Sequence, residues 1–123
     1  MNEENRIKSF TDLIVWQKCH QLVLEVYKLT EKFPSKEVFS LTDQMRRAAV
    51  SITSNIAEGF GRQTYKEKIQ FYYVSSGSIS ELKNQIMIAK DLDYIKPDKI
   101  LYELCNDCHR LINGLISASK RRK

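Results

Sequence analysis

The sequence predicts an all-α protein, an antiparallel up-down-up-down four-helix bundle. Only four glycines and two prolines stand in 123 residues, so few positions can end a helix. Apolar residues recur at spacings of 3 and 4 through four long segments, which is the pattern of helices that bury one face. Short connections make consecutive helices antiparallel neighbours. We expect one domain with one core over residues 1–123.

The first helix is expected to begin at Thr11 or Asp12, either of which can cap it. It should end at Phe33, because Pro34 disfavours helical geometry in the residue before it. His20 falls on the inward stripe of this helix, where a hydrogen-bonded core histidine is the expected role.

The central element is the segment 41–61, which is apolar or small-sided over most of its circumference. At about 100° of rotation per residue, its core stripe comprises Leu41, Met45, Ala48, Ala49, Ile52, Ile56 and Gly59. A helix of this composition has to be covered on several sides. Either sister helices or another subunit can cover it, so we expect it at the centre of the bundle or of an assembly.

Capping signals bound the two middle helices. The sequence S-x-x-D at 40–43 is an acidic variant of the capping box and opens the second helix. Gly59 or Gly61, in the left-handed conformation, is expected to end it. The T-x-x-E sequence at 64–67 is a full capping box, so the third helix begins there and runs to about Tyr94.

Small residues at 75–78 interrupt the third helix, and Gly77 costs about 1 kcal/mol relative to alanine there. Close approach of another helix explains the patch, with residues 48–51 as the facing surface, and a local kink is the alternative. Residues on the polar flanks of the second and third helices are the expected subunit interface: Gln44, Ser51, Asn55, Glu58, Gly77 and Glu81.

The fourth helix is expected to carry Pro97 in its first turn, with Asp98 near the positive end of the helix dipole. Its apolar positions are Leu101, Leu104, Cys105, Cys108, Leu111, Ile112 and Leu115. Both chain ends are polar, so we expect a frayed segment at 1–10 and a basic tail at 119–123.

The net charge of +5 is concentrated in the tail. Residues 1–60 sum to zero, and the tail holds four of the basic residues that remain in excess, which leaves the body near +1. Such tails bind nucleic acid by counterion release, and a solubilising chain end is the alternative role. The candidate nucleic-acid contacts are Arg46, Arg47, Arg62, Lys66, Lys68, Lys120, Arg121, Arg122 and Lys123.

The sequence C-x-x-C-H at 105–109 matches the pattern that attaches c-type haem. That attachment follows export, however, and Cys105 and Cys108 fall on the apolar stripe, where cysteine acts as a small hydrophobe. A zinc site would need a second pair of ligands at 19–20, which are adjacent in sequence on another helix. The sequence has no nucleophile with a base, no paired carboxylates and no phosphate-binding glycine loop at a spacing typical of an active site. We therefore expect no enzyme activity, cofactor or metal.

The N-terminal sequence MNEENRIKSF has no apolar region typical of a signal peptide. No stretch approaches the ~18 continuous apolar residues that span a bilayer. Three cysteines, an odd number, fit a reducing compartment. We therefore expect a cytoplasmic protein without a membrane partner.

Four sequence blocks resemble the bacterial family of 23S rRNA intervening-sequence proteins, to which the retroelement accessory protein Avd is similar. They are FTDL with VWQ at 10–17, LxxQMRRAAVSI at 41–52, SNIAEG at 54–59 and GSxxELxxQIxxA at 77–89. The resemblance implies a four-helix bundle that assembles as a homopentamer with a basic central channel. It also implies nucleic-acid binding or a reverse transcriptase partner, and it brings no catalytic residues.

The expected function is therefore that of a non-enzymatic oligomer that binds RNA, DNA or a nucleoprotein partner. The alternative is a purely structural protein–protein interaction module that binds no nucleic acid.

Overall fold

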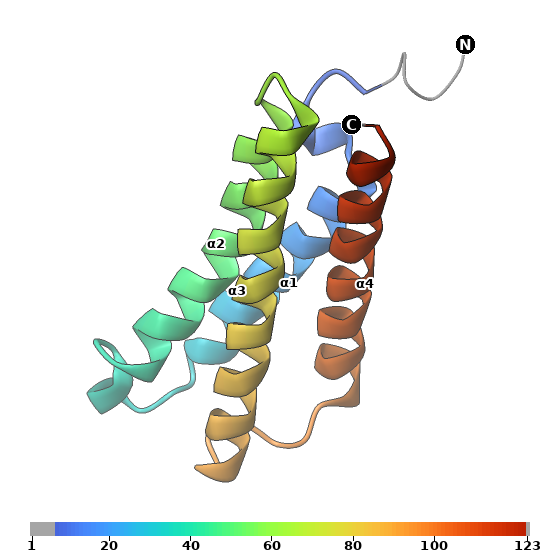
Figure 1. Ribbon diagram of the computed structural model, residues 1–123. Coiled ribbons are helices and arrows are strands. Elements are labelled where there is room, and N and C mark those ends of the chain that lie inside the picture. Colours follow the sequence, from blue (N-terminus) through green and yellow to red (C-terminus); the bar gives the residue numbers. More distant parts are fainter. Residues whose placement is uncertain (1–6, 123) are drawn as a thin grey trace.

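The computed structural model describes residues 7–122, in which every regular element is helical. In chain order these are η2 (Phe10–Asp12), α1 (Ile14–Thr30), η3 (Ser35–Glu37), α2 (Leu41–Phe60), α3 (Tyr65–Asp91) and α4 (Lys99–Arg121). Successive α-helices run in opposite directions along the molecule (Figure 1). Because α1 also packs against α4, the four helices close into the bundle expected from the sequence.

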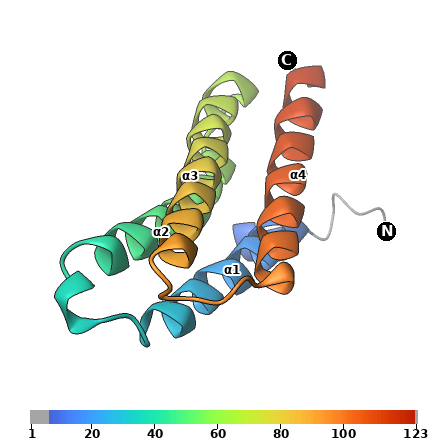
Figure 2. The ribbon, with the colours of Figure 1, turned by 90° about the horizontal axis from the view of Figure 1, so that it is seen from below.

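Helix α2 packs against α1 and α3, and each of the other α-helices likewise has two main neighbours, so α2 does not lie at the centre expected for it. It makes its most extensive contact with α3, and the two helices lie side by side in both views (Figure 1 and Figure 2). All seven residues of its expected core stripe are buried, which confirms that prediction. Six of them, all but Gly59, share one apolar cluster with Leu22 of α1, Ile79 of α3 and Ile112 of α4.

Helix α1 is shorter than expected at both ends. The chain first forms the single turn η2, which a capping box between Ser9 and Asp12 closes. Leu13 then adopts extended backbone, so α1 starts at Ile14. At its C-terminal end Phe33 turns into the core, with its ring centroid 5.4 Å from that of Tyr94. Of the segment expected to fray, residues 1–6 lie outside the described part of the chain.

Helix α2 begins after Ser40 and ends before Gly61, as expected, but the expected capping contacts at these two ends are wrong. The backbone of Ser40 (φ −126°, ψ −110°) lies outside the extended region typical of N-cap residues, and its side chain makes no capping hydrogen bond. Asp43 instead pairs with Arg47, at 2.9 Å between Oδ2 and Nε. At the other end Gly61 has φ −78°, and no glycine within residues 7–122 has a positive φ.

Gly59 serves a different purpose from the one expected. A Cβ atom at this position would lie 2.6 Å from Cε1 of Tyr72 and 3.0 Å from Cβ of Phe71. A Cβ contact of 2.6 Å is essentially never seen in proteins, so any side chain larger than that of glycine would force α2 and α3 to shift.

The start of α3 agrees with the expectation, since the Thr64 hydroxyl accepts a hydrogen bond from the backbone N–H of Glu67. The serines at 75 and 78 pack against α2. Ser75 donates to the carbonyl of Ile52 at 2.7 Å. Within this chain, however, Gly77 faces outward with nothing within 4 Å of a built Cβ atom, so the close approach is made by the serines.

The connection between α3 and α4 begins earlier than expected. Helix α3 ends at Asp91 rather than near Tyr94, and Asp93 has φ 63° in the turn that follows. Asp98 then caps α4 by accepting from the backbone N–H of Leu101, so Pro97 precedes the helix instead of lying in its first turn.

The three cysteines are buried where α1 meets α4, and all three are free thiols. A hydrogen bond with Cys108, together with burial, raises the pKa of Cys19, and burial raises the pKa of Cys105 to about 12. The thiols of Cys19 and Cys105 therefore stay protonated at neutral pH, and all three buried cysteines act as small core hydrophobes. No helix within residues 7–122 is long and apolar enough to cross a membrane.

Candidate nucleic-acid interface

The turn between α2 and α3 lies at the same end of the bundle as the C-terminus of α4 (Figure 1). Six basic residues from these two distant parts of the sequence therefore share one end. We call this set the basic end: Arg62, Lys66, Lys68, Lys120, Arg121 and Arg122. The acidic residues within the same segments are Glu58 and Glu67.

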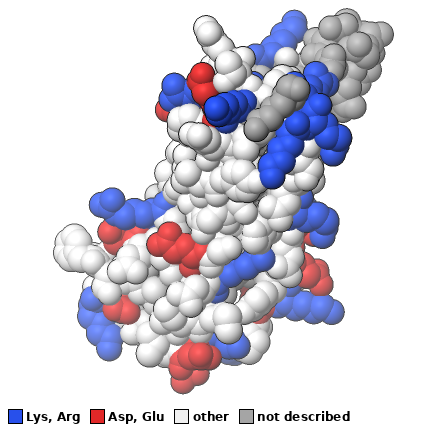
Figure 3. Space-filling view, viewed as in Figure 1, with Lys and Arg blue, Asp and Glu red and all other residues white. Residues whose placement is uncertain are grey.

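Basic side chains predominate at this end, whereas basic and acidic side chains are intermixed over the lower part of the visible face (Figure 3). The ninth candidate, Lys123, lies outside the described residues. The positive charge is thus concentrated at one end of a body that is otherwise balanced.

Aromatic rings lie directly beneath these cations. Nζ of Lys120 is 5.1 Å from the ring centroid of Tyr73, and the guanidinium carbon of Arg62 is 4.6 Å from that of Phe71. The guanidinium of Arg122 is 6.0 Å from the centroid of Tyr65. Such cation–π contacts hold flexible side chains over the rings. The interface therefore combines positive charge with π surface.

Two of the six cations also have structural roles. Lys68 donates to the carbonyl of Phe60 at 2.6 Å, which caps the C-terminal end of α2, and desolvation lowers its pKa. Arg62, in the turn after α2, pairs with Glu58 at 3.2 Å, an exposed ion pair that contributes little to stability. Within residues 7–122, Lys66 and Arg121 make no ion pair, so their full charge is available to a polyanion.

A pocket of about 490 Å³ opens in the middle of the basic end. Residues from the N-terminal segment, the end of α2, the start of α3 and the end of α4 surround it: Ile7, Leu13, Phe60, Tyr65, Lys68, Tyr72, Leu115, Ala118, Ser119 and Arg122. Burial raises the pKa of Tyr72 to about 12, so its phenol stays neutral at physiological pH. The pocket thus has apolar and aromatic walls with two cations beside it.

The expected interface residues gather on a second surface, along the outer side of α2 and α3. We call it the seam face, and it comprises Gln44, Arg47, Ser51, Asn55 and Glu58 of α2 with Gly77, Ser78, Glu81 and Gln85 of α3. A hydrogen bond of 2.8 Å between the hydroxyls of Ser51 and Ser78 joins the two helices at its middle. Asn55 donates to the carbonyl of Ser51 at 2.7 Å.

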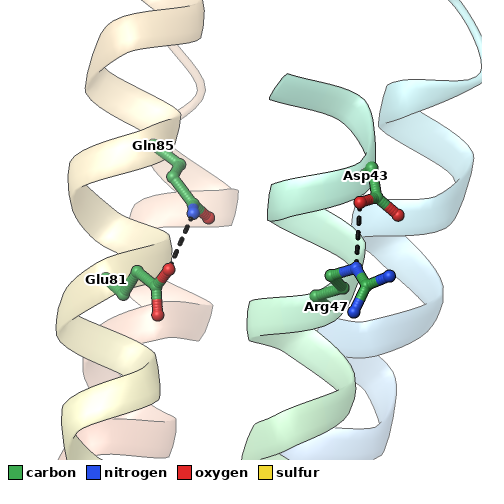
Figure 4. A network of polar contacts seen from close by, with 4 residues as sticks. All are labelled: Asp43, Arg47, Glu81 and Gln85. Atoms are coloured by element: carbon green, nitrogen blue, oxygen red, sulfur yellow. Dashed lines mark hydrogen bonds and ion pairs between the residues drawn. The ribbon is translucent and has the colours of Figure 1, made fainter. Parts of the chain in front are cut away.

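The charged groups of the seam face are bonded within their own helices. Figure 4 shows Arg47 paired with Asp43 on α2, and Gln85 donating to Glu81 at 3.2 Å on α3. Gln85 is only 3% exposed, yet its Oε1 atom has no hydrogen-bond partner among the described residues. The seam face therefore holds an unsatisfied buried acceptor beside exposed polar groups.

Comparison with known protein families finds one family model that matches parts of all four α-helices. The family model of the 23S rRNA-intervening sequence protein matches residues 11–116. The chain belongs to this family. No curated protein matches the sequence. In this 23S rRNA-intervening sequence protein the matched region includes the α2–α3 turn, whereas the cations at the end of α4 lie beyond it.

The remaining two arginine candidates of this family member lie away from the basic end. Arg46 packs α2 against α1: its Nε donates to the hydroxyl of Thr30 at 2.8 Å and its guanidinium carbon is 4.7 Å from the ring centroid of Tyr27. Arg47 lies on the seam face with its side chain 79% exposed. The nine candidates therefore do not form one site.

Sequence reasoning did not anticipate a polar cluster between α3 and α4. Lys83 donates to Nδ1 of His109 at 3.0 Å, so Nε2 carries the proton and bonds to the hydroxyl of Ser76 at 3.1 Å. Desolvation and the charge of Lys83 lower the pKa of His109. The other histidine, His20, is half-buried and stacks on Trp16 at 4.6 Å, whereas a hydrogen bond was expected for it.

Proposed function

We propose that this 23S rRNA-intervening sequence protein is a non-catalytic, oligomeric bundle that binds nucleic acid through the basic end, within the cytoplasm. The observation that carries the proposal is the convergence of the α2–α3 turn with the end of α4 (Figure 1). It joins cations that are more than 50 residues apart in the chain. Clustered Lys and Arg side chains release counterions from a phosphate backbone, and this release drives sequence-independent binding.

The experiment compares two variants with the same change in charge. Lys120→Gln/Arg121→Gln removes two cations from the basic end, and Lys32→Gln/Lys36→Gln removes two exposed cations from the opposite end of the bundle. Fluorescence anisotropy with a labelled RNA at low salt measures binding. We expect a loss of roughly tenfold or more in affinity for the first variant and less than about twofold for the second.

Equal losses in the two variants would show that only net charge matters and would contradict a localised site. If the RNA binds neither the wild-type protein nor either variant at any salt concentration, the result would favour the alternative function, a structural module that docks proteins. A reverse transcriptase bound to nucleic acid is one nucleoprotein partner that this surface would suit, because the basic end would contact its nucleic acid.

We further propose that the seam face joins copies of the chain, with the homopentamer as the expected assembly. A neighbouring chain that donates a hydrogen bond to Oε1 of Gln85 would satisfy that buried acceptor, which otherwise costs free energy. Val74 and Ile88 are exposed along the same side of α3. Phe39, 95% exposed just before α2, adds an apolar side chain for a neighbour to cover.

Two glycines provide a matched test of this contact. Gly77 lies on the seam face and Gly114 lies on α4, and a Cβ atom at either position meets nothing within 4 Å in the chain. Gly77→Phe should therefore fold normally but block an approaching neighbour, whereas Gly114→Phe should not. Light scattering should show a smaller assembly for Gly77→Phe alone. Wild-type protein that is monomeric at every concentration would contradict the proposed assembly.

A further inference from the structure

The pocket at the basic end differs from an ordinary phosphate-binding surface. Its walls are largely apolar, with Leu13, Phe60 and Leu115 among them, and cations lie only beside it. Its volume of about 490 Å³ falls in the range, about 300–1,000 Å³, of pockets that enclose small organic ligands. Phosphate groups are strongly hydrated and would gain nothing from such walls, so the pocket suits a different part of an anionic ligand.

One polar group in the pocket lacks a partner. Tyr72 is 2% exposed and lines the pocket, and its hydroxyl makes no hydrogen bond with any group of residues 7–122. Among the described residues the buried side-chain polar atom without a partner is Oε1 of Gln85, so the Tyr72 hydroxyl is open to the pocket and can donate to a ligand there. A ligand that carries an acceptor on the edge of a flat ring would accept this hydrogen bond.

The second tyrosine offers a surface on which a flat ring can stack. Tyr65 is half-buried at the pocket, and both Lys68 and Arg122 lie 6.0 Å from its ring centroid. Aromatic side chains beside cations are the elements that bind single-stranded nucleic acid, because the bases stack on the rings while the phosphates contact Lys and Arg. A duplex keeps its bases paired inside and would leave the pocket empty.

We propose that this pocket takes one unstacked nucleobase of a single-stranded nucleic acid, with Tyr65 as the stacking surface and the Tyr72 hydroxyl as a donor to the base edge. Lys66, Lys120 and Arg121 then contact the flanking phosphates. The inference rests on the proposed function and deepens it, since it names single strands as the preferred ligand of the basic end.

The test fills the pocket without changing the charge. Ala118→Leu places extra carbon atoms in the pocket wall, and Ser117→Leu, at the neighbouring exposed position of α4, is the matched control. The probes are a labelled 12-nucleotide oligouridylate and a 12-base-pair RNA duplex, at equal salt. We expect Ala118→Leu to bind the single strand about tenfold more weakly and the duplex within about twofold of wild type, with Ser117→Leu unchanged for both.

A second measurement uses the wild-type protein, so it does not depend on the folding of a variant. Oligouridylate that contains 5-iodouracil is irradiated in the complex, and the crosslinked residue is identified by mass spectrometry. We expect the adduct at Tyr65 or Tyr72, the two aromatic rings that line the pocket together with Phe60. An adduct at the exposed ring of Tyr73 would overturn the inference.

The outcomes separate the inference from the function on which it rests. If the single strand binds Ala118→Leu as tightly as wild type, the pocket is not used, yet the basic end can still bind phosphates. If neither the strand nor the duplex binds wild-type protein in a salt-dependent manner, both the inference and the proposed function fail.

Discussion

Gly59 controls how closely α2 and α3 pack, and its substitution is a prediction at the scale of one residue. Gly59→Ala would place a methyl group 2.6 Å from the Tyr72 ring, so we expect a loss of about 1–3 kcal/mol in the free energy of unfolding. Gly77→Ala, in open space on α3, should instead gain up to about 1 kcal/mol. Urea denaturation measures both. Equal stability of the two variants would contradict the packing argument.

The lowered pKa of His109 leads to a prediction of how the stability of the protein depends on pH. Its pKa in the folded protein is lowered from 6.5, so between the two values the unfolded chain binds more protons. Stability should therefore fall as the pH drops below about 6.5 and level off below the folded-state pKa. His109→Gln removes this contribution. Urea denaturation at pH 7.5 and 5.5 should show a smaller loss for the variant, and an identical loss in both proteins would contradict the prediction.

At the scale of whole elements, the core faces could be predicted from the sequence, and the helix ends only in part. The stripe of α2 depends only on helical periodicity, so each of its residues is buried as expected. Capping depends on how the chain enters the helix. The backbone of Ser40 leaves its hydroxyl without a capping bond, whereas the extended Thr64 makes one. In the sequence, Gly59 suggested a helix end. Its actual role, a close contact with Tyr72, could not be predicted because Tyr72 lies on another helix.

The candidate site also depends on contacts between helices, which the sequence does not show. The cations were visible as sequence runs, but the pocket joins Tyr65 and Tyr72 of α3 to Leu115 and Ala118 of α4. No local pattern relates positions that far apart in the chain. The roles of Lys68, as a cap on α2, and of Arg46, as a link to α1, likewise depend on contacts between helices.

The contrast between the two capping residues gives a prediction for the helices themselves. Thr64→Ala removes the hydrogen bond to the backbone of Glu67, so it should cost about 1 kcal/mol of unfolding free energy. Ser40→Ala removes no capping bond and should cost only a few tenths of that. Thermal or urea denaturation of the two variants measures the difference. A larger loss for Ser40→Ala would contradict the assignment of the caps.

For the whole molecule, the basic end and the seam face lie in different places, one at an end of the bundle and one along its side (Figure 1 and Figure 4). In a ring assembled through the seam face, cyclic symmetry would carry every basic end to the same side. Repetition of a modest charge cluster then produces a strong local field and multivalent binding. The proposed assembly would thereby let a body near neutral charge hold a polyanion.

The salt dependence of RNA binding by the wild-type protein tests the central claim most directly. The logarithm of the binding constant should fall linearly with the logarithm of salt concentration, by about 0.7–0.9 for each phosphate contacted. If the three cations assigned to phosphates bind them, the slope for each chain that contacts the RNA should be roughly −2 to −3. Absent binding, or binding indifferent to salt, would contradict a nucleic-acid role for the basic end.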